Sequence, residues 1–525
     1  MDELIKLGLN TLENLPESVS CPSYKRSQMS AGMVHIGVGN FHRAHQAWYL
    51  HRLMQQGSAL DWAIVGSGVR LPSDEQMRQR LLDQDFLTTL IELDPKGVSS
   101  EVVGSMIGFL PVETDNAALI AQMADPAIRI VSLTVTEGGY YIDPVSGAFD
   151  TTHPEIVHDS QNPERPKTAF GAIVAALKSR KENAHQPFTV MSCDNLMGNG
   201  AVVQQTVVSL ARMSNPALAD WIDENCCFPN SMVDCIVPAT GEKELSLVRE
   251  LGIDDQAPVT HENFRQWVIE DNFCAGRPDW HLVGVTFTES VHDYEVMKLR
   301  ILNAGHQILA NAGEILSVET ISQCMNHPAI SAMFSKVQLE EIVPQVAPVP
   351  GMEPAQYVKL IENRFSNEAI VDTTRRVAFD GSSRHTGFLL PIVNERVAAN
   401  LPVEGLALVE AIWARMCEGT REDGTVIEPN DPFWDDLKET AVSARKRPLA
   451  WLEQEQYYGN LKDAQSFADA FDRWLEMIWE IGVAKTLDQY TSNARSAFQS
   501  KHQQAGDQIR RQETDADGVH SQSKY

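Results

Sequence analysis

The chain has 525 residues, a hydrophobic content of 43%, a charged content of 22% and a formal net charge of −28. Single hydrophobic cores stop growing at roughly 250–300 residues, so this length predicts two domains. The composition excludes a disordered or fibrous chain, and the negative charge disfavours partners such as nucleic acid and anionic membrane surfaces.

The cysteines and the N-terminal residues bear on the cellular compartment in which the protein resides. Eight scattered cysteines form no C-x-x-C pair and no regular spacing, which argues against a disulfide framework or a closed zinc site. The first residues are acidic and lack a basic region followed by an apolar run, and no run of roughly 18 apolar residues occurs. We therefore expect a cytoplasmic protein with reduced thiols and no membrane span.

A short buried strand over residues 32–39 ends in the turn Gly37-x-Gly39, and a helix is expected over residues 41–55. In dinucleotide-binding folds the first glycine makes the tight turn, and the second lets the backbone approach a pyrophosphate. His42 stands where the third glycine of that fingerprint is expected. The turn alone fits a plain strand-to-helix connection as well as a cofactor loop.

The next strand, residues 62–66, should end in the acid that binds the cofactor ribose. No carboxylate stands there, and the first acid, Asp74, comes later in a loop. A carboxylate near the ribose favours NAD, because it accepts from the 2′-hydroxyl and repels a 2′-phosphate. Arg70, in the same loop, leaves NADP open.

Strand and helix candidates then alternate along the chain. The strand candidates are residues 86–92, 128–135 and 187–192, and the helix candidates are residues 117–123 and 168–181. This alternation predicts an α/β domain with a Rossmann-type doubly wound sheet. The loops that carry Glu137 and Asn195 follow the last two strands, where such sheets bind ligands, although an Asp-Asn pair is also a common turn sequence.

One stretch, residues 294–306, combines apolar residues with three polar ones, Lys298, Asn303 and His306. On an ideal helix Asn303 and His306 share a face, and Lys298 lies about 80° round from His306. An ammonium among apolar neighbours loses solvation, which favours the neutral amine that can accept a proton. Alternatively, Lys298 reaches solvent, Asn303 bonds to backbone and His306 is a core residue.

From Lys298 onward the pattern is mostly helical. The helix candidates are residues 298–312, 315–325, 330–343, 354–364, 389–400, 406–419 and 464–483. We therefore expect a Rossmann-type domain over residues 1–297 and an α-helical domain over residues 298–504. Residues 505–525 are polar and are predicted to be a disordered tail.

Five motifs occur in one order: Gly37-Val-Gly-Asn-Phe-His-Arg-Ala-His-Gln46, Ser132-Leu-Thr-Val-Thr-Glu-Gly-Gly-Tyr140, Met191-Ser-Cys-Asp-Asn195, Phe228-Pro-Asn-Ser-Met-Val-Asp234 and Lys298-x4-Asn303-x2-His306. With them the chain resembles the polyol-specific long-chain dehydrogenases, in particular those of the mannitol 2-dehydrogenase type. The resemblance implies a monomeric, zinc-independent enzyme that uses NAD to interconvert a polyol and a ketose, with D-mannitol and D-fructose as the favoured pair.

The resemblance also implies roles for individual residues. Lys298 matches the base, Asn195 and Asn303 match two oxyanion-hole donors, and His306 matches a residue that positions the substrate. Asp234, Arg376 and Arg384 match substrate contacts, and Glu295 matches a residue on a proton path. The positions that match cofactor contacts are Gly37, Gly39, Asn40, Phe41, Asp74 and Glu137. No metal ligand is implied.

The chemistry agrees with these roles, because two amide donors can bind a developing alkoxide while a lysine takes the proton, without a metal. Cys235 follows Asp234 where the family usually has arginine, which leaves substrate preference open. The alternatives are a hexonate oxidoreductase acting on mannonate and fructuronate, a D-arabinitol dehydrogenase, and a catalytically inactive nucleotide-sensing protein.

Overall fold

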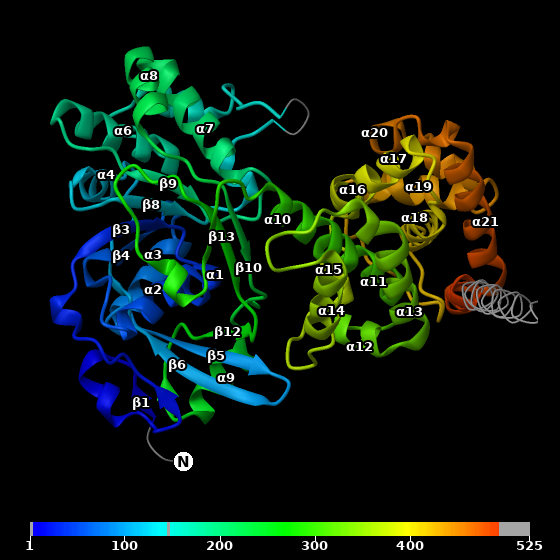
Figure 1. Ribbon diagram of the computed structural model, residues 1–525, viewed down its shortest axis with the longest axis horizontal. Coiled ribbons are helices and arrows are strands. Elements are labelled where there is room, and N and C mark those ends of the chain that lie inside the picture. Colours follow the sequence, from blue (N-terminus) through cyan, green and yellow to red (C-terminus); the bar gives the residue numbers. More distant parts are fainter. Residues whose placement is uncertain (1–3, 144–146, 493–525) are drawn as a thin grey trace, which may run out of the picture. The chain divides into compact units, whose positions relative to one another are not determined.

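The computed structural model describes residues 4–143 and 147–492, so the predicted tail, residues 505–525, lies outside the described residues. The chain forms two compact units, Met1–Glu295 and Val296–Tyr525 (Figure 1). Among the described residues, no helix is both long enough and apolar enough to cross a bilayer.

The first unit is built on a five-stranded sheet in the order β7-β4-β3-β8-β9, in which all neighbouring strands are parallel. Its strands are β3 (Ala31–Ile36), β4 (Ala63–Ser67), β7 (Met106–Phe109), β8 (Ile130–Leu133) and β9 (Thr189–Ser192). Parallel neighbours joined through helices are the predicted Rossmann-type arrangement, so the predicted fold class is confirmed.

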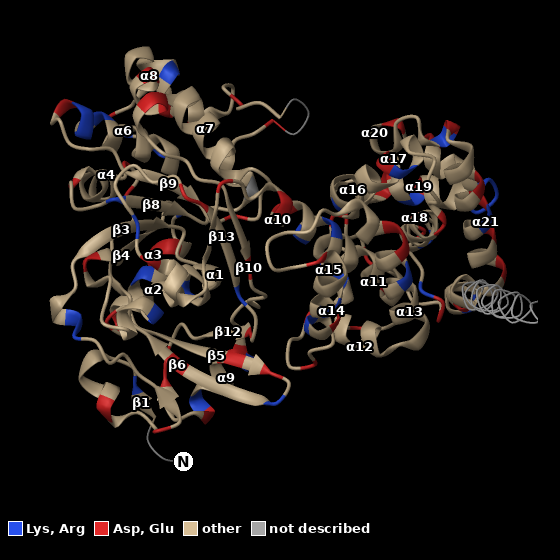
Figure 2. Ribbon diagram, in the orientation of Figure 1, with Lys and Arg blue, Asp and Glu red and all other residues tan. Residues whose placement is uncertain are grey.

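Both faces of this sheet are buried. Val34 and Ile36 of β3 enter one hydrophobic core, whereas Met33 enters the other, as the two-residue period of a strand requires. Within the described chain, none of the five strands contains a Lys, Arg, Asp or Glu (Figure 2). The helices of this unit are α1 (Asn40–Ala44), α2 (Gln46–Gln55), α3 (Ser73–Leu82), α4 (Ala117–Ala124), α5 (Pro154–Gln161), α6 (Ala169–Glu182), α7 (Asn199–Ser214), α8 (Pro216–Asn225) and α9 (Glu242–Glu250).

The predicted strand over residues 86–92 forms, but not in the doubly wound sheet. It is β5 (Thr88–Asp94), which pairs antiparallel with β6 (Gly97–Val103) across a tight connection. Alternation of residue types predicts a strand without specifying its partner, and the short connection selects the adjacent antiparallel one. These strands belong to the sheet β12-β5-β6-β2, and the remaining sheets are β10-β13-β14 and β1-β11. Their other strands are β1 (Ile5–Lys6), β2 (Val19–Ser20), β10 (Ser231–Asp234), β11 (Ile253–Asp254), β12 (Val259–Glu262), β13 (Gln266–Glu270) and β14 (Thr286–Thr288).

The helix predicted over residues 41–55 is divided into α1 and α2 at His45, whose backbone has φ −117° and ψ −90°. The His45 ring lies edge-on to Trp267, and its Nε2 is 3.0 Å from the Gln266 carbonyl oxygen. The His45 side chain therefore contacts β13 at the point where the helix breaks. Hydrophobic periodicity within the helix does not reveal such a break, because it depends on a tertiary contact.

The second unit is built from helices and the segments that connect them. Its helices are α11 (Ala304–Ile315), α12 (Ile321–Asn326), α13 (Pro328–Val337), α14 (Pro354–Phe365), α15 (Thr374–Val377), α16 (Gly381–Arg384), α17 (Leu390–Ala398), α18 (Glu404–Cys417), α19 (Trp434–Ala444), α20 (Glu455–Tyr458) and α21 (Gln465–Ile481). The helix predicted over residues 315–325 starts later than expected. Ser317 has a positive φ of 58°, and the Thr320 hydroxyl caps α12 by accepting from the Gln323 amide.

The helix predicted over residues 298–312 also differs from an ideal one. After α10 (His292–Met297), residues Lys298–Asn303 form a π-helical segment, and α11 follows directly. The angle expected between Lys298 and His306 assumed an ideal α-helix, so it does not apply to this segment.

Candidate active site

The glycine turn after β3 is closed on both sides. Gly37 has a φ of +97°, and a Cβ at this position would lie 2.1 Å from the Thr134 carbonyl oxygen, so only glycine fits. The Gly37 carbonyl oxygen accepts from the Thr134 hydroxyl at 2.5 Å, and the Gly37 amide donates to the Ser67 carbonyl. The turn is therefore fixed against the carboxyl ends of β4 and β8.

Gly39 is different, because a Cβ there would meet nothing closer than the Gly37 carbonyl oxygen at 4.0 Å. Gly39 caps α1 and is exposed. The open space over this backbone fits the close approach of a dinucleotide pyrophosphate, which is the use expected of the second glycine.

The neighbouring predicted cofactor residues have protein partners. The Asn40 amide group donates to the Pro238 carbonyl at 3.0 Å and to the Thr240 hydroxyl at 2.9 Å. The Phe41 ring stacks on His45 at a centroid distance of 4.8 Å. Both side chains thus brace the glycine turn from within the first unit. The structure does not describe the side chain of Glu137.

Asp74 lies in the first turn of α3, not in a loop as the sequence predicted, and from there it closes the loop after β4. Its Oδ2 accepts from the Val69 amide at 3.0 Å and the Arg70 amide at 2.9 Å, and a Cβ on Gly68 would lie 2.4 Å from that oxygen. Arg70 in turn donates to the Val135 carbonyl at 2.9 Å. Asp74 therefore has a role within the loop and places a carboxylate at the carboxyl end of β4.

Two loops lie at the carboxyl ends of β8 and β9, and we call residues 135–140 and 194–198 the sheet-end loops. Asn195 lies in the second loop and is exposed. The preceding residue, Asp194, is buried, and its carboxylate accepts from the amides of Val135 and Thr136. The expected proximity of the two loops is thus present. Glu295 joins this group, because its carboxylate accepts from the Gly198 amide at 3.0 Å.

Asp234 is the last residue of β10 and is buried. It pairs across the sheet with Gln266 of β13. Its position at a strand end, followed directly by the half-buried Cys235, is what the sequence motif predicts, although its role in binding substrate hydroxyls remains a prediction.

The second unit contains the other predicted catalytic residues on residues 298–315, which we call the site helix. Lys298 is buried, and Asn303 and His306 are half-buried. Residues five apart point about 140° apart on an α-helix, whereas a π-helix closes its hydrogen bonds between residues five apart. The π-helical segment therefore brings Lys298 and Asn303 toward one face, where a base and an amide donor can act on one substrate oxygen.

His306 has two neighbours that fix its ring. It stacks on Phe365 at a centroid distance of 4.3 Å, and its Nε2 lies 3.8 Å from Oδ2 of Asp372. Asp372 also accepts from Arg376, at 2.7 Å from Nε and 2.6 Å from Nη2. Burial raises the pKa of the Asp372 carboxyl, and the Arg376 charge opposes that change. One buried carboxylate thus links two residues that the sequence predicts for substrate binding.

Sequence reasoning missed Asp372, since an acid four residues before an arginine reads as an ordinary surface pair. Arg376 is exposed, and its partner is buried, which no local pattern reveals. Arg384, at the end of α16, is half-buried and donates to the Val377 carbonyl at 2.7 Å. Arg376 and Arg384 are therefore both attached to α15 or its flanks.

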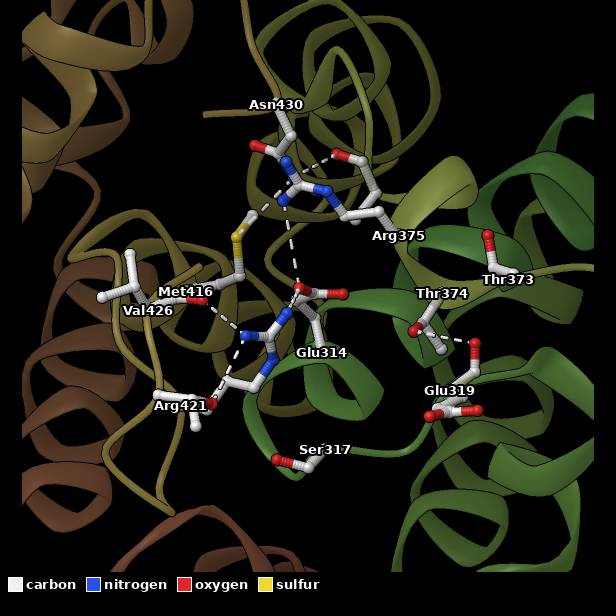
Figure 3. Close-up of polar contacts among 12 residues, drawn as sticks. Glu314, Ser317, Glu319, Thr373, Thr374, Arg375, Met416, Arg421, Val426 and Asn430 are labelled. Atoms are coloured by element: carbon white, nitrogen blue, oxygen red, sulfur yellow. Dashed lines mark hydrogen bonds and ion pairs between the residues drawn. The ribbon is translucent and has the colours of Figure 1, made fainter. Parts of the chain in front are cut away.

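A second carboxylate, Glu314, holds the far end of the site helix (Figure 3). It is 3% exposed and lies 2.5 Å from Nη2 of Arg421 and 3.9 Å from Nη1 of Arg375. Arg375 donates to the Pro429 carbonyl, and Arg421 donates to the Val426 carbonyl. Because Arg375 precedes Arg376, this network ties the site helix to the segment that carries a predicted substrate contact.

A buried polar chain also joins the site helix to the π-helical segment that follows Arg384. Asn311 lies 2.9 Å from Nε2 of His385, and Nδ1 of that ring lies 2.8 Å from Glu410. The other oxygen of Glu410 accepts from the Tyr458 hydroxyl at 2.7 Å. The residues of this network are fully or almost fully buried, so their hydrogen bonds hold the site helix in place.

The described part of the chain contains no cluster of three or more His, Cys, Asp or Glu side chains suited to a metal ion. The donors brought together at the sheet-end loops and on the site helix are amides, a lysine and a histidine. These groups suit proton transfer and the binding of a developing oxyanion.

Comparisons with known proteins agree with the motifs. The mannitol dehydrogenase Rossmann domain model matches residues 31–282, and the mannitol dehydrogenase C-terminal domain model matches residues 290–479. The chain is 52% identical over 476 residues to a mannitol 2-dehydrogenase of Cereibacter sphaeroides, covering 91% of this chain and 99% of that protein. A mannitol 2-dehydrogenase of Pyricularia oryzae is 37% identical over 485 residues, covering 91% of this chain and 96% of that protein.

Two solved structures share the whole fold. The Pseudomonas fluorescens mannitol 2-dehydrogenase in ternary complex with NAD and D-mannitol is 40% identical, with a TM-score of 0.82, covering 93% of this chain and 99% of that one. A D-sorbitol dehydrogenase in substrate-free form is 34% identical, with a TM-score of 0.85, covering 92% of this chain and 100% of that one. The resemblance predicted from the five ordered motifs is confirmed: the chain belongs to the mannitol dehydrogenase family.

Proposed function

We propose that this protein is an NAD-dependent oxidoreductase that interconverts D-mannitol and D-fructose. Family membership and the names of its relatives support the reaction class, and the relative solved with NAD and D-mannitol supports this cofactor and substrate. The observation that best supports the proposal is the π-helical segment from Lys298 to Asn303, because hydrogen bonds between residues five apart leave a buried lysine and a half-buried amide about one turn apart.

Oxidation of a secondary alcohol removes a proton from oxygen and a hydride from carbon. When bound, NAD supplies the acceptor for the hydride. Lys298 takes the proton as the general base, and the side-chain amides of Asn195 and Asn303 donate to the oxygen as it becomes negative. His306 orients the substrate, and its ring is held by Phe365 and Asp372.

The remaining predicted residues receive supporting roles. Asp234, Arg376 and Arg384 bind substrate hydroxyls, and Glu295 lies on the path by which Lys298 exchanges its proton with solvent. Gly37, Gly39, Asn40, Phe41, Asp74 and Glu137 form the cofactor site, with Gly39 supplying the open backbone. The carboxylate of Asp74 favours NAD over NADP, because it repels a 2′-phosphate.

We also propose that the functional domains divide between residues 297 and 298, and that the enzyme is a cytoplasmic monomer that binds no nucleic acid. Light scattering behind size exclusion tests the monomer directly. A molar mass of twice 58.3 kDa would contradict it.

The deciding experiment measures kcat/KM for mannitol, sorbitol, arabinitol and mannonate, each with NAD and with NADP. We expect mannitol with NAD to give the highest value. A preference for mannonate would replace the proposal with a hexonate oxidoreductase, and a preference for arabinitol or sorbitol would change the substrate within the same chemistry. Binding of NAD without turnover of any polyol would favour the inactive nucleotide-sensing alternative.

A further inference from the structure

Thr136, three residues after the end of β8, has a backbone that threonine rarely adopts. Its φ is +68° and its ψ is 162°, a combination that is essentially confined to glycine. Two glycines, Gly138 and Gly139, follow within three residues, yet neither has a positive φ between +20° and +160°. The strain falls on a β-branched residue that is not itself among the proposed cofactor or substrate contacts.

Asp194 holds this strained backbone in place. Its Oδ2 accepts from the Val135 amide at 2.9 Å, and its Oδ1 accepts from the Thr136 amide at 3.1 Å. The Tyr140 hydroxyl donates to Oδ2 at 2.6 Å. Charge-assisted bonds of this kind are stronger than neutral ones, and together they fix the peptide groups on either side of Val135, the second of which leads into Thr136.

The backbone of Asp194 is fixed as firmly as its side chain. Its carbonyl oxygen accepts from the Asn199 side-chain amide at 3.0 Å and from the Leu196 amide at 3.0 Å. Asn199 is itself bonded to both backbone groups of Ser231. The peptide that leads into Asn195 therefore starts from a residue with little freedom.

We propose that Asp194 is a positioning residue, which clamps the strained Val135–Thr136 turn to the second sheet-end loop and thereby sets the direction of Asn195. The proposal rests on the proposed function in one respect, namely that Asn195 donates to the substrate oxygen. Both oxygens of the Asp194 carboxylate accept from donors of its own unit, and the proposal assigns it no part in proton transfer.

The test is a double-mutant cycle between Asp194→Asn and Thr136→Gly. In Asp194→Asn, an NH₂ group replaces one oxygen and faces a donor, so the clamp opens on one side. We expect kcat for mannitol oxidation to fall about 10–100-fold, since small misplacements of an acting group have large effects, with KM for mannitol within about threefold. Glycine adopts the backbone of Thr136 without strain, so Thr136→Gly alone should change kcat by less than about twofold.

The double variant decides the matter. If the clamp acts through the strained turn, kcat of the double variant should be at least about fivefold higher than kcat of Asp194→Asn. A loss in Asp194→Asn that Thr136→Gly leaves unchanged overturns the proposal, and so does wild-type kcat in Asp194→Asn. Tyr140→Phe removes one donor and keeps both backbone bonds, so its kcat should fall less than about threefold.

Asp150→Asn is the matched control, because Asp150 also accepts from a nearby amide and hydroxyl, those of Thr152, in a surface turn of the same unit. Its kcat should equal that of the wild type. Thermal unfolding gives a second readout that does not need activity. Asp194→Asn should lower Tm by about 2–4 °C, and Thr136→Gly should restore at least half of that decrease.

The clamp and the proposed function can be contradicted separately. A wild-type protein that oxidises no polyol contradicts the proposed function, and the clamp is then judged by the Tm cycle alone. Equal Tm values for the wild type and Asp194→Asn would in that case overturn the clamp. An active wild type with no coupling between Thr136 and Asp194 overturns the clamp and leaves the proposed function standing.

Discussion

The sheet-end loops and the site helix hold their polar side chains in different ways. In the loops, one carboxylate, Asp194, collects the backbone donors of a strained turn. On the site helix, the repeating backbone presents Lys298, Asn303 and His306, and charged residues outside the helix, Asp372 beside His306 and Arg421 paired with Glu314, brace it. Loops lack repeating hydrogen bonds, so their geometry depends on single anchors, whereas a helix distributes its support.

The largest expected effect comes from Lys298→Ala. Loss of the general base should lower kcat for mannitol oxidation by about 10²–10⁴-fold, while the affinity for NAD changes little, because the lysine acts on the substrate proton. Steady-state kinetics and a fluorescence titration with NAD measure the two quantities. Lys298→Arg keeps the charge but provides no base, so it should be as inactive as the alanine variant. Wild-type turnover in either variant removes Lys298 from the mechanism.

The same residue predicts opposite pH profiles for the two directions. Oxidation needs the neutral amine and should rise with pH, whereas fructose reduction needs the protonated amine and should fall. The profiles are measured under conditions where a deuterium isotope effect on the transferred hydride shows that chemistry limits the rate. Profiles that run parallel in both directions would require another proton carrier.

Asn195→Ala and Asn303→Ala test one donor from each region. Each loss should lower kcat by about 10²–10³-fold, with a smaller change in KM, because the donors bind the developing alkoxide better than the alcohol. If Asn195 depends on its loop anchor, its loss should be similar in size to, or larger than, that of Asp194→Asn. Unchanged kcat with raised KM would reclassify both residues as substrate contacts only.

The sequence predicted what depends on local pattern. Strands β3, β4, β8 and β9, the Gly37 turn and the helical character of the second unit follow from periodicity and from the residues that turns require. It did not predict the partner of β5, because pairing depends on the connection and on other strands. Nor did it predict the π-helical segment at Lys298, since hydrogen-bond offsets leave no mark on hydrophobic spacing.

In the candidate site, too, features that follow from the local sequence were predicted and features that depend on tertiary contacts were not. Asn195 was located by its place after a strand, whereas the anchor beside it, Asp194, looked like an ordinary turn residue. Asp372 was missed because its burial depends on tertiary packing, which the local sequence does not show. Anchoring residues are defined by tertiary contacts, so a single sequence shows the residue that acts more readily than the residue that holds it.

Asp372→Asn tests whether support on the site helix is distributed. The variant weakens the pairing with Arg376, and KM for mannitol should rise about tenfold, with kcat changed less. Asp271→Asn is the control, because Asp271 makes a similar two-point pair with Arg277 on the surface of the first unit. A fall in kcat as large as that of Asp194→Asn would erase the contrast between the two regions.

The raised pKa of Asp372 adds a pH dependence to this test. A carboxyl with a raised pKa is protonated at a higher pH than an exposed one, and protonation weakens its pair with Arg376. In the wild type, KM should therefore increase as the pH falls, beginning above the range of an ordinary aspartate. In Asp372→Asn this increase should be absent, and an identical profile in both proteins would assign it to another group.

The smallest expected effect concerns Asp74, the anchor of the loop after β4. Its Oδ2 is occupied by the Val69 and Arg70 amides, so replacement by alanine both opens the loop and removes a negative charge. Asp74→Asn separates these effects, since it keeps one acceptor oxygen for the loop but not the charge. At a half-exposed site a charge contributes little, so the ratio of kcat/KM with NAD to that with NADP should fall only about fivefold in Asp74→Asn. In Asp74→Ala the ratio should fall by a similar factor, while KM for both cofactors rises with the loss of the loop anchor. If the ratio is unchanged in both variants, Asp74 only anchors its loop. Asp74 would then resemble Asp194, whose carboxylate binds backbone amides without contacting the ligand.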